Sequence, residues 1–254
     1  MAPAELPLSR DQVDRFAADG FLAIERIASA DEVLRLRALY DAVLADPSGL
    51  TLTYRGARDD GSPGIITQVF SPEWKRPELL ETEYLANARR LAAALLQVDD
   101  RDVAYGGLMF IHKPAGEGRD TPWHQDEAYW AELSALRCHS LSVWMPLDDV
   151  TVESGCMQYV PRSHVGDVRA HVKPPGAEPL RLREPVDPDT AVPCEIPAGG
   201  ATVHYCRTIH YGGANVSTVP RRAMTTIFHG PGSARPVPLE KPWLAGGAVW
   251  ADAR

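Results

Sequence analysis

The sequence predicts a mainly β fold in which N-terminal helices flank a double-sheet, jelly-roll core. Apolar residues at helical spacing dominate the first third of the chain. From about Val103 onward, short β-rich runs alternate with Gly, Pro and Asp, as an antiparallel sandwich or barrel requires. We expect residues 1–254 to form one domain, because β-sandwiches of this length commonly do.

Two helices are expected to begin after serine caps, Ser9 and Ser29. The second should end at Asp46, because Pro47 cannot continue a helix. A third helix is expected over residues 81–97, and the apolar run at 20–24 predicts a strand between the first two. The predicted apolar stripes are Val13, Phe16 and Ala17 in the first helix, and Val33, Leu36, Tyr40, Val43 and Leu44 in the second.

The remaining strands are expected in the second part of the chain. Between them, residues 166–189 are rich in Pro, Arg and Glu, which predicts a long surface loop. The candidate strands are residues 108–113, 139–146, 157–160, 201–205 and 223–229.

Composition and charge narrow the functional classes. The net charge of −8 argues against a nucleic-acid partner, since such proteins usually carry a basic face. The four cysteines are widely spaced without a CxxC pair, which favours buried free thiols over zinc sites or disulfides. There is no apolar run long enough to cross a membrane and no secretory leader pattern, so we expect a cytoplasmic protein without membrane association.

A histidine and a carboxylate at ligand spacing are the most informative feature. His124 and Asp126 are two residues apart, so an extended chain would direct both side chains to one side. Together with a distant second histidine they would form the two-histidine, one-carboxylate face of non-haem iron(II) oxygenases, which leaves coordination positions open. Alone, the pair is a weak signal, because the chain contains eight histidines.

The downstream context strengthens this interpretation. His210 precedes Arg221 by eleven residues across a glycine-containing segment. This spacing fits a ligand at the end of one strand and a guanidinium on the next antiparallel strand. An arginine fork binds a carboxylate bidentately, as a keto diacid chelated to iron would require. Arg222 is the rival for this role, although strand alternation allows only one of the two to face the pocket.

These motifs resemble the phytanoyl-CoA dioxygenase (PhyH) family of iron(II)- and 2-oxoglutarate-dependent oxygenases. Several ordered motifs at compatible spacing carry the resemblance. They are residues 108–114 (LMFIHKP), 121–126 (TPWHQD), 143–150 (VWMPLDDV), 155–156 (GC), 161–164 (PRSH) and 210–222.

The resemblance implies roles for individual residues. His124, Asp126 and His210 would bind iron, and Arg221 would bind the distal carboxylate of 2-oxoglutarate. It also places Lys113, Trp144 and Ser217 at the co-substrate pocket, the last through the Asn-x-Ser spacing after Asn215. Where family members often carry serine two residues after the distal histidine, this chain has Gly212, so that hydrogen bond must be absent or supplied elsewhere.

The implied activity is hydroxylation of an unactivated carbon of a small-molecule metabolite. Iron(II), 2-oxoglutarate and O2 would be required, and succinate and carbon dioxide would be released. Related halogenases carry a small residue in place of the carboxylate ligand, so Asp126 favours hydroxylation, desaturation or another oxidation over chlorination. The motifs identify neither the substrate nor the oligomeric state.

Other polar residues receive structural interpretations. Asp148 and Asp149 are expected to end a strand in a turn, and Arg207 to be a solvated strand-edge residue, with binding of an anionic substrate as the alternative. Pocket and core positions are equally expected for Trp123, Tyr129 and Trp130. Structural or surface positions are expected for His112, His139, His171, His204 and His229, and a turn is expected at His164.

Three other functional classes stay open. The same scaffold could serve a metal-dependent cupin-type enzyme or binding protein, but such a protein does not need a keto-acid clamp such as Arg221. An oxygenase acting on a polypeptide and a scaffolding protein are the other two.

Overall fold

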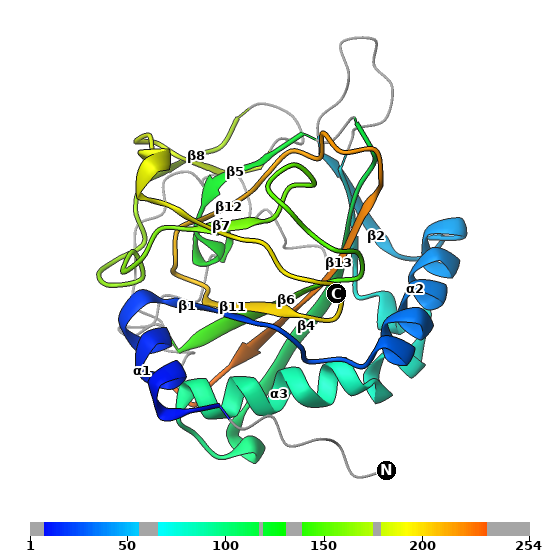
Figure 1. The fold of residues 1–254 in the computed structure, drawn as a ribbon, viewed down its shortest axis with the longest axis horizontal. Coiled ribbons are helices and arrows are strands. Elements are labelled where there is room, and N and C mark those ends of the chain that lie inside the picture. The colour runs from blue at the N-terminus through cyan, green and yellow to red at the C-terminus, as the bar shows by residue number, and fades with distance from the viewer. Residues whose placement is uncertain (1–7, 56–65, 117–118, 131–138, 175–178, 233–254) are drawn as a thin grey trace.

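The computed structural model describes residues 8–55, 66–116, 119–130, 139–174 and 179–232, and within them two β-sheets face each other with helices outside (Figure 1). In Figure 1, the helices α1 and α3 lie below the larger sheet and α2 lies beside it. The helices are α1 (Arg10–Asp19), α2 (Ala30–Ala45) and α3 (Glu83–Leu96). This arrangement confirms the predicted jelly-roll core with flanking helices.

The larger sheet, here the major sheet, has seven antiparallel strands in the order β1-β11-β6-β13-β4-β3-β2. Neighbours in this order come from distant parts of the chain, so the sheet joins the first and last thirds of the described residues. Its strands are β1 (Phe21–Ile24), β2 (Thr51–Arg55), β3 (Ile66–Phe70), β4 (Ala104–Lys113), β6 (Ser140–Pro146), β11 (Ala201–Tyr205) and β13 (Arg221–His229).

The smaller sheet, here the minor sheet, has four antiparallel strands in the order β10-β7-β12-β5. A separate pair, β8 (His171–Val172) with β9 (Arg181–Leu182), lies outside both sheets. The minor-sheet strands are β5 (Thr121–His124), β7 (Met157–Tyr159), β10 (Val192–Cys194) and β12 (His210–Gly212).

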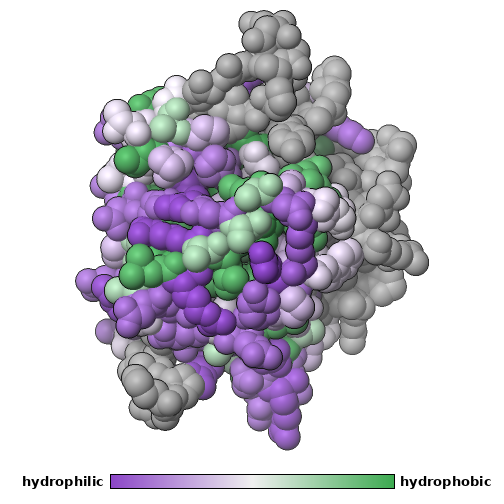
Figure 2. All heavy atoms as spheres, turned by 90° about the vertical axis from the view of Figure 1, so that its right-hand side faces the viewer, coloured by the Kyte–Doolittle hydropathy of each residue, from purple (hydrophilic) through white to green (hydrophobic). Residues whose placement is uncertain are grey.

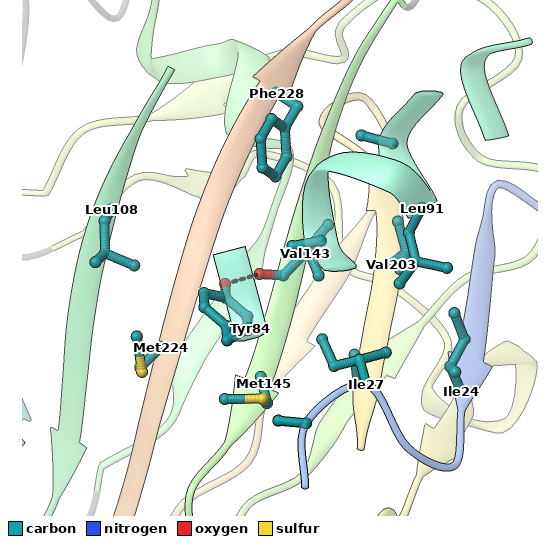
Figure 3. Close-up of a cluster of buried hydrophobic side chains, with 14 of the residues drawn as sticks. Ile24, Ile27, Tyr84, Leu91, Leu108, Val143, Met145, Val203, Met224 and Phe228 are labelled. Carbon is teal, nitrogen blue, oxygen red and sulfur yellow. Dashed lines mark hydrogen bonds between the residues drawn. The ribbon is translucent and has the colours of Figure 1, made fainter. Parts of the chain in front are cut away.

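Alternation along the major-sheet strands divides the apolar residues into two cores. Val143 in β6 and Met224 in β13 belong to the cluster that packs against the helices (Figure 3). Trp144 and Ala223, the adjacent residues, belong to a second cluster together with residues of the minor sheet such as Tyr159. Successive strand residues point to opposite faces, so the inner face of the major sheet is directed at the minor sheet.

Tyr84 connects α3 to the middle of the major sheet. The side chain is fully buried, and its hydroxyl donates to the Val143 carbonyl at 2.9 Å (Figure 3). The same hydroxyl lies 2.9 Å from Thr226 Oγ1 in the neighbouring strand. A polar group in an apolar core needs such partners, and these two position α3 relative to β6 and β13.

The predicted helix starts are confirmed. Ser9 forms a capping box with Gln12, and the Ser29 hydroxyl accepts from the Glu32 amide. Phe16 and four residues of the second stripe are buried, but Ala17 is exposed, so its predicted place in the first stripe is wrong. The third helix begins after its cap at Thr82, within two residues of the predicted bounds.

The candidate strands are confirmed, with β4 beginning four residues earlier than predicted, but β2, β3, β5, β10 and β12 were not among them. Strands β2 and β3 lie in the first third of the chain, which was predicted to be helical apart from residues 20–24. The predicted surface loop at 166–189 is also partly wrong, since it contains β8 and β9 and buries His171 and Leu180. Both errors concern short segments, whose strand formation depends on packing and pairing more than on local propensity.

The described part of the molecule has a mostly polar surface on one side and buried cysteines, in line with the composition of the chain. On the side where α2 lies, the described surface is largely hydrophilic with small hydrophobic patches (Figure 2). Cys156, Cys194 and Cys206 are buried free thiols, as predicted, and Cys138 lies outside the described residues. None of the helices in the described ranges is long and apolar enough to span a bilayer.

We expect Tyr84→Phe to lower the free energy of unfolding by about 1–2 kcal/mol, because it removes a buried hydroxyl that contacts both Val143 and Thr226. Urea denaturation monitored by circular dichroism measures the change. An unfolding midpoint equal to that of the wild type would show that this hydroxyl does not stabilise the contact between α3 and the sheet.

Candidate metal centre

Two histidines from adjacent strands of the minor sheet face each other. His124 ends β5, His210 begins β12, and the two residues are direct partners in the strand register. Their ring centroids lie 4.2 Å apart. Cross-strand pairing thus brings together two imidazoles that are far apart in sequence.

Asp126 completes this group. Gln125 keeps an extended backbone, so the side chains of His124 and Asp126 point to the same side, although Asp126 already begins a short 3-10 helix. Asp126 Oδ1 lies 3.6 Å from His124 Nε2 and 3.5 Å from His210 Nε2. One potential ligand atom from each of the three residues lies within 4.8 Å of the other two. The predicted triad is therefore assembled in space.

Backbone carbonyls orient both imidazoles. His124 Nδ1 lies 2.8 Å from the Pro122 carbonyl, and His210 Nδ1 lies 2.9 Å from the Thr208 carbonyl. A carbonyl can only accept, so each Nδ1 carries the hydrogen and each Nε2 directs its lone pair at the shared space. This tautomer is the one that metal-ligating histidines require.

The charge states also suit a metal ion. Burial lowers the pKa of His124 to about 4, which leaves the ring neutral at pH 7. Burial by itself would raise the pKa of Asp126, but the surrounding imidazoles of His210, His124 and His204 favour the ionised carboxylate and hold this pKa well below its usual value. Two imidazole nitrogens and one carboxylate oxygen match the donor set of a non-haem iron(II) site.

A buried ion pair connects the segments that carry the ligands. The Arg207 Nε and one terminal amino group donate to Glu127 Oε2 at 2.9 and 2.8 Å, and both side chains are buried. Gln125 adds a second link, since its side-chain amide donates to the Arg207 carbonyl at 2.6 Å. The expectation of a solvated Arg207 is wrong, because the turn between β11 and β12 directs this side chain inward.

Arg221 enters the same cavity from the opposite sheet. The cavity has a volume of about 320 Å³ and is lined by the three candidate ligands, Arg221 and Trp144. Strand β13, which begins at Arg221, pairs with β4 and β6 in the major sheet, whereas β12 belongs to the minor sheet. The predicted return along an adjacent antiparallel strand is therefore wrong. The connection crosses between sheets, and the two sheets hold the arginine and the histidines on facing walls.

The Arg221 guanidinium is buried without a hydrogen-bond acceptor among the described residues. Its Nε has no partner, and its Cζ lies 5.4 Å from the centroid of the Trp144 ring. The Trp144 Nε1 is likewise buried without a partner. Burial lowers the pKa of Arg221 to about 10, so it is still a cation at neutral pH. Buried donors of this kind normally have acceptors, which indicates an anionic ligand at this end of the cavity.

Strand alternation places the rival arginine elsewhere. Arg222 points toward the helices, where two of its guanidinium nitrogens contact Asp148 at 3.1 and 2.8 Å. A third nitrogen contacts Asp41 of α2 at 3.0 Å. Asp148 therefore anchors Arg222, and Arg221 is the arginine that faces the cavity.

Lys113 and Ser217 support the turn that follows His210. Lys113 is fully buried, lies opposite Arg221 in the strand register and donates to the Gly212 and Gly213 carbonyls at 2.9 and 2.6 Å. The Ser217 hydroxyl donates to Asn215 Oδ1 at 2.7 Å. Neither residue is among those that line the cavity, so their contact with the co-substrate stays a prediction.

His204, which was interpreted as a structural or surface residue, is buried beside the triad. This residue lies in β11, lines the cavity and brings its Nε2 to 3.3 Å from Asp126 Oδ2. Alternation in the predicted strand 201–205 could have revealed it, because apolar Ala201 and Val203 share one face and Thr202 and His204 the other.

Other residues with open roles are also placed. His171 is buried, and its Nε2 accepts a hydrogen bond from the backbone N–H of Gln125 at 3.2 Å. It therefore supports the segment that carries His124 and Asp126. Tyr129 and Trp130 line the cavity. Trp123 instead stacks on Tyr211, with ring centroids 5.0 Å apart.

Comparisons with known proteins agree with this geometry. The family model for phytanoyl-CoA dioxygenase (PhyH) matches residues 16–223. Ectoine dioxygenase of Stutzerimonas stutzeri is 27% identical over 254 residues, with 88% of this chain and 77% of the relative covered. The crystal structure of EvdO2 from Micromonospora carbonacea var. aurantiaca complexed with 2-oxoglutarate superposes with a TM-score of 0.75 at 33% identity, covering 93% of this chain and 97% of that one. EctD from S. alaskensis, at 24% identity and a TM-score of 0.68, shares the fold.

We expect Arg207→Met to lower the free energy of unfolding by roughly 3–5 kcal/mol, because it takes the guanidinium away from a buried carboxylate. Chemical denaturation measures this loss. Arg10→Met is the matched control, since the Arg10 and Asp14 side chains are 94% and 72% exposed and their ion pair should contribute nothing measurable. Equal effects of the two substitutions would contradict a stabilising role for the buried pair.

Proposed function

Because this chain belongs to the phytanoyl-CoA dioxygenase (PhyH) family, we propose that it hydroxylates an unactivated C–H bond of a small-molecule metabolite. The enzyme is a 2-oxoglutarate-dependent dioxygenase that uses iron(II) and O2. In the proposed reaction, one oxygen atom of O2 enters the substrate as a hydroxyl group. The other enters succinate as 2-oxoglutarate loses carbon dioxide, so atoms and electrons balance.

One observation carries the proposal: the triad His124, Asp126 and His210 shares a cavity with the unpartnered cation of Arg221. The triad would hold iron(II), and together with 2-oxoglutarate the bound iron would supply the oxidising power for C–H cleavage. The chain contributes binding and orientation.

Arg221 is proposed to bind the distal carboxylate of 2-oxoglutarate. Its planar fork can donate two parallel hydrogen bonds to a carboxylate, which fixes direction as well as distance. The Trp144 Nε1 lies at the same end of the cavity and supplies a further donor. Since the arginine lies on the major sheet and the triad on the opposite side, a diacid bound between them would be held at both ends.

The rest of the cavity suits an uncharged portion of an organic substrate. Apart from the triad, His204 and Arg221, every described lining residue is neutral. Such a lining favours substrates whose reactive carbon lies in an apolar or hydroxylated region. The aromatic members are Phe70, Tyr129, Trp130 and Trp144, and the hydroxyl or amide members include Gln68, Ser71, Thr121, Ser142 and Thr225.

The alternative, a non-oxygenase metal enzyme or metal-binding protein on the same scaffold, explains less of the cavity. Such a protein needs the triad but has no use for a buried arginine and a tryptophan N–H without acceptors on the facing wall. A scaffolding protein would need neither feature.

We expect Arg221→Leu to raise the KM for 2-oxoglutarate about 100-fold, because losing one partner of a buried charge pair costs on the order of 2–5 kcal/mol. Succinate formation by anaerobically iron-loaded enzyme exposed to O2 gives the value. Arg222→Gln is the adjacent control. It should lower stability through lost contacts with Asp148 while leaving this KM within about twofold of the wild type. Equal KM increases in both variants would reject the assigned roles.

Loss of a ligand should abolish both metal binding and turnover. We expect His210→Ala and Asp126→Gly each to lose stoichiometric iron(II) binding in an anaerobic titration and to form no succinate, because each removes a ligand of the triad. His139→Ala is a suitable control, since this residue contacts the Pro231 carbonyl and is absent from the described cavity lining. Unchanged iron binding in His210→Ala would refute the triad.

A further inference from the structure

A third histidine contacts the candidate iron site. His204 is 2% exposed, and its Nε2 lies 3.3 Å from Asp126 Oδ2. The other carboxylate oxygen, Oδ1, is the one close to His124 and His210. The two oxygens of Asp126 therefore have different partners: Oδ1 faces the candidate ligands, and Oδ2 faces His204.

The His204 ring is held from several sides. Its centroid lies 4.4 Å from that of His210 and 5.1 Å from that of Tyr159. The Tyr159 hydroxyl lies 3.2 Å from His204 Nδ1 and 2.7 Å from Thr202 Oγ1. Tyr159 itself stacks on Phe21 at a centroid distance of 4.8 Å. This packing gives the imidazole one orientation, with Nε2 directed at Asp126.

The partners also fix the direction of the hydrogen bond. An ionised carboxylate offers only acceptors, so the contact with Oδ2 is favourable when His204 Nε2 carries the hydrogen. The Nδ1 atom is then an acceptor beside the Tyr159 hydroxyl, which donates to Thr202 Oγ1 in the structure and donates to Nδ1 when its hydrogen turns away from Thr202. His204 does not belong to the set whose ligand atoms all lie within 4.8 Å of one another, so the geometry assigns it a contact with the carboxylate rather than with the metal.

We propose that His204 is a positioning residue that holds Asp126 Oδ2 away from the iron, so that the carboxylate binds through Oδ1 alone. This inference rests on the proposed function, since it assumes an iron(II) oxygenase site. Chelation by both oxygens would occupy an additional coordination position. An oxygenase of this class needs the open positions for its keto-acid co-substrate and O2. The hydrogen bond thus preserves the vacancy that the reaction requires.

The test compares two substitutions at this position. His204→Phe keeps a planar ring but cannot donate a hydrogen bond, whereas His204→Gln can donate through its carboxamide. Tyr84→Phe is the control for lost stability, since it removes a buried hydrogen bond in the other core, outside the described cavity lining. Anaerobic titration gives the iron(II) Kd, and the visible absorption spectrum of the cobalt(II)-substituted protein reports the coordination.

We expect His204→Phe to raise the iron(II) Kd about 10–100-fold, the usual effect of removing a partner of a metal ligand, and to change the cobalt(II) spectrum. In His204→Gln the Kd should return to within a few-fold of the wild-type value, and in Tyr84→Phe it should be unchanged. A wild-type Kd and spectrum in His204→Phe would overturn the inference, as would equal losses in the Phe and Gln variants.

A further variant covers the case in which His204→Phe does not fold. Tyr159→Phe removes the hydroxyl near Nδ1 but keeps the ring that packs on His204. A Kd raised several-fold would support the inference, and an unchanged Kd would overturn it. If the wild-type protein itself fails to bind iron(II), the proposed function fails as well. Iron binding by the wild type without any effect of these variants removes only the role of His204.

Discussion

The site depends on the pairing of β5 with β12, which makes His124 and His210 direct neighbours in the minor sheet. Backbone hydrogen bonds between these strands set the distance between two imidazoles that are far apart in sequence. Carbonyl groups two residues before each histidine then fix its tautomer. Because sheet register is specified by the whole strand pair, the metal-binding geometry is established before any ion binds.

The site also depends on the inner face of the major sheet, which forms the cavity wall opposite the two candidate histidine ligands. The major sheet supplies Arg221, Trp144 and His204 because alternation directs these residues inward while their neighbours pack against the helices. Placing a guanidinium there costs desolvation energy that no described residue offsets by a hydrogen bond. An enzyme can retain such an arrangement when a bound anion completes it. In the proposed function, the buried arginine would be a cost in the free protein and a source of binding energy for a diacid.

The buried contacts near the triad serve to position it. The ion pair between Arg207 and Glu127, the amide of Gln125 and the imidazole of His204 all act on residues next to a candidate ligand or on the ligand itself. Such contacts reduce the freedom of the ligands in the metal-free protein, so less order has to be imposed when iron binds. The same contacts link residues 124–127, which carry two of the candidate ligands, to the loop before His210, the third. A change in one segment is therefore expected to affect the other.

Local chemistry in the sequence determined the helices, their serine caps, six of the thirteen described strands and the candidate ligands, because caps, periodicity and motif spacing act over a few residues. Motif spacing favoured Arg221 over Arg222, and the structure directs Arg221 into the cavity and Arg222 toward Asp148. Strands β2 and β3, the inward turn of Arg207 and the contact of His204 with Asp126 were decided by the tertiary structure. These features join residues tens of positions apart, and their register, burial and partners arise only when the two sheets pack together.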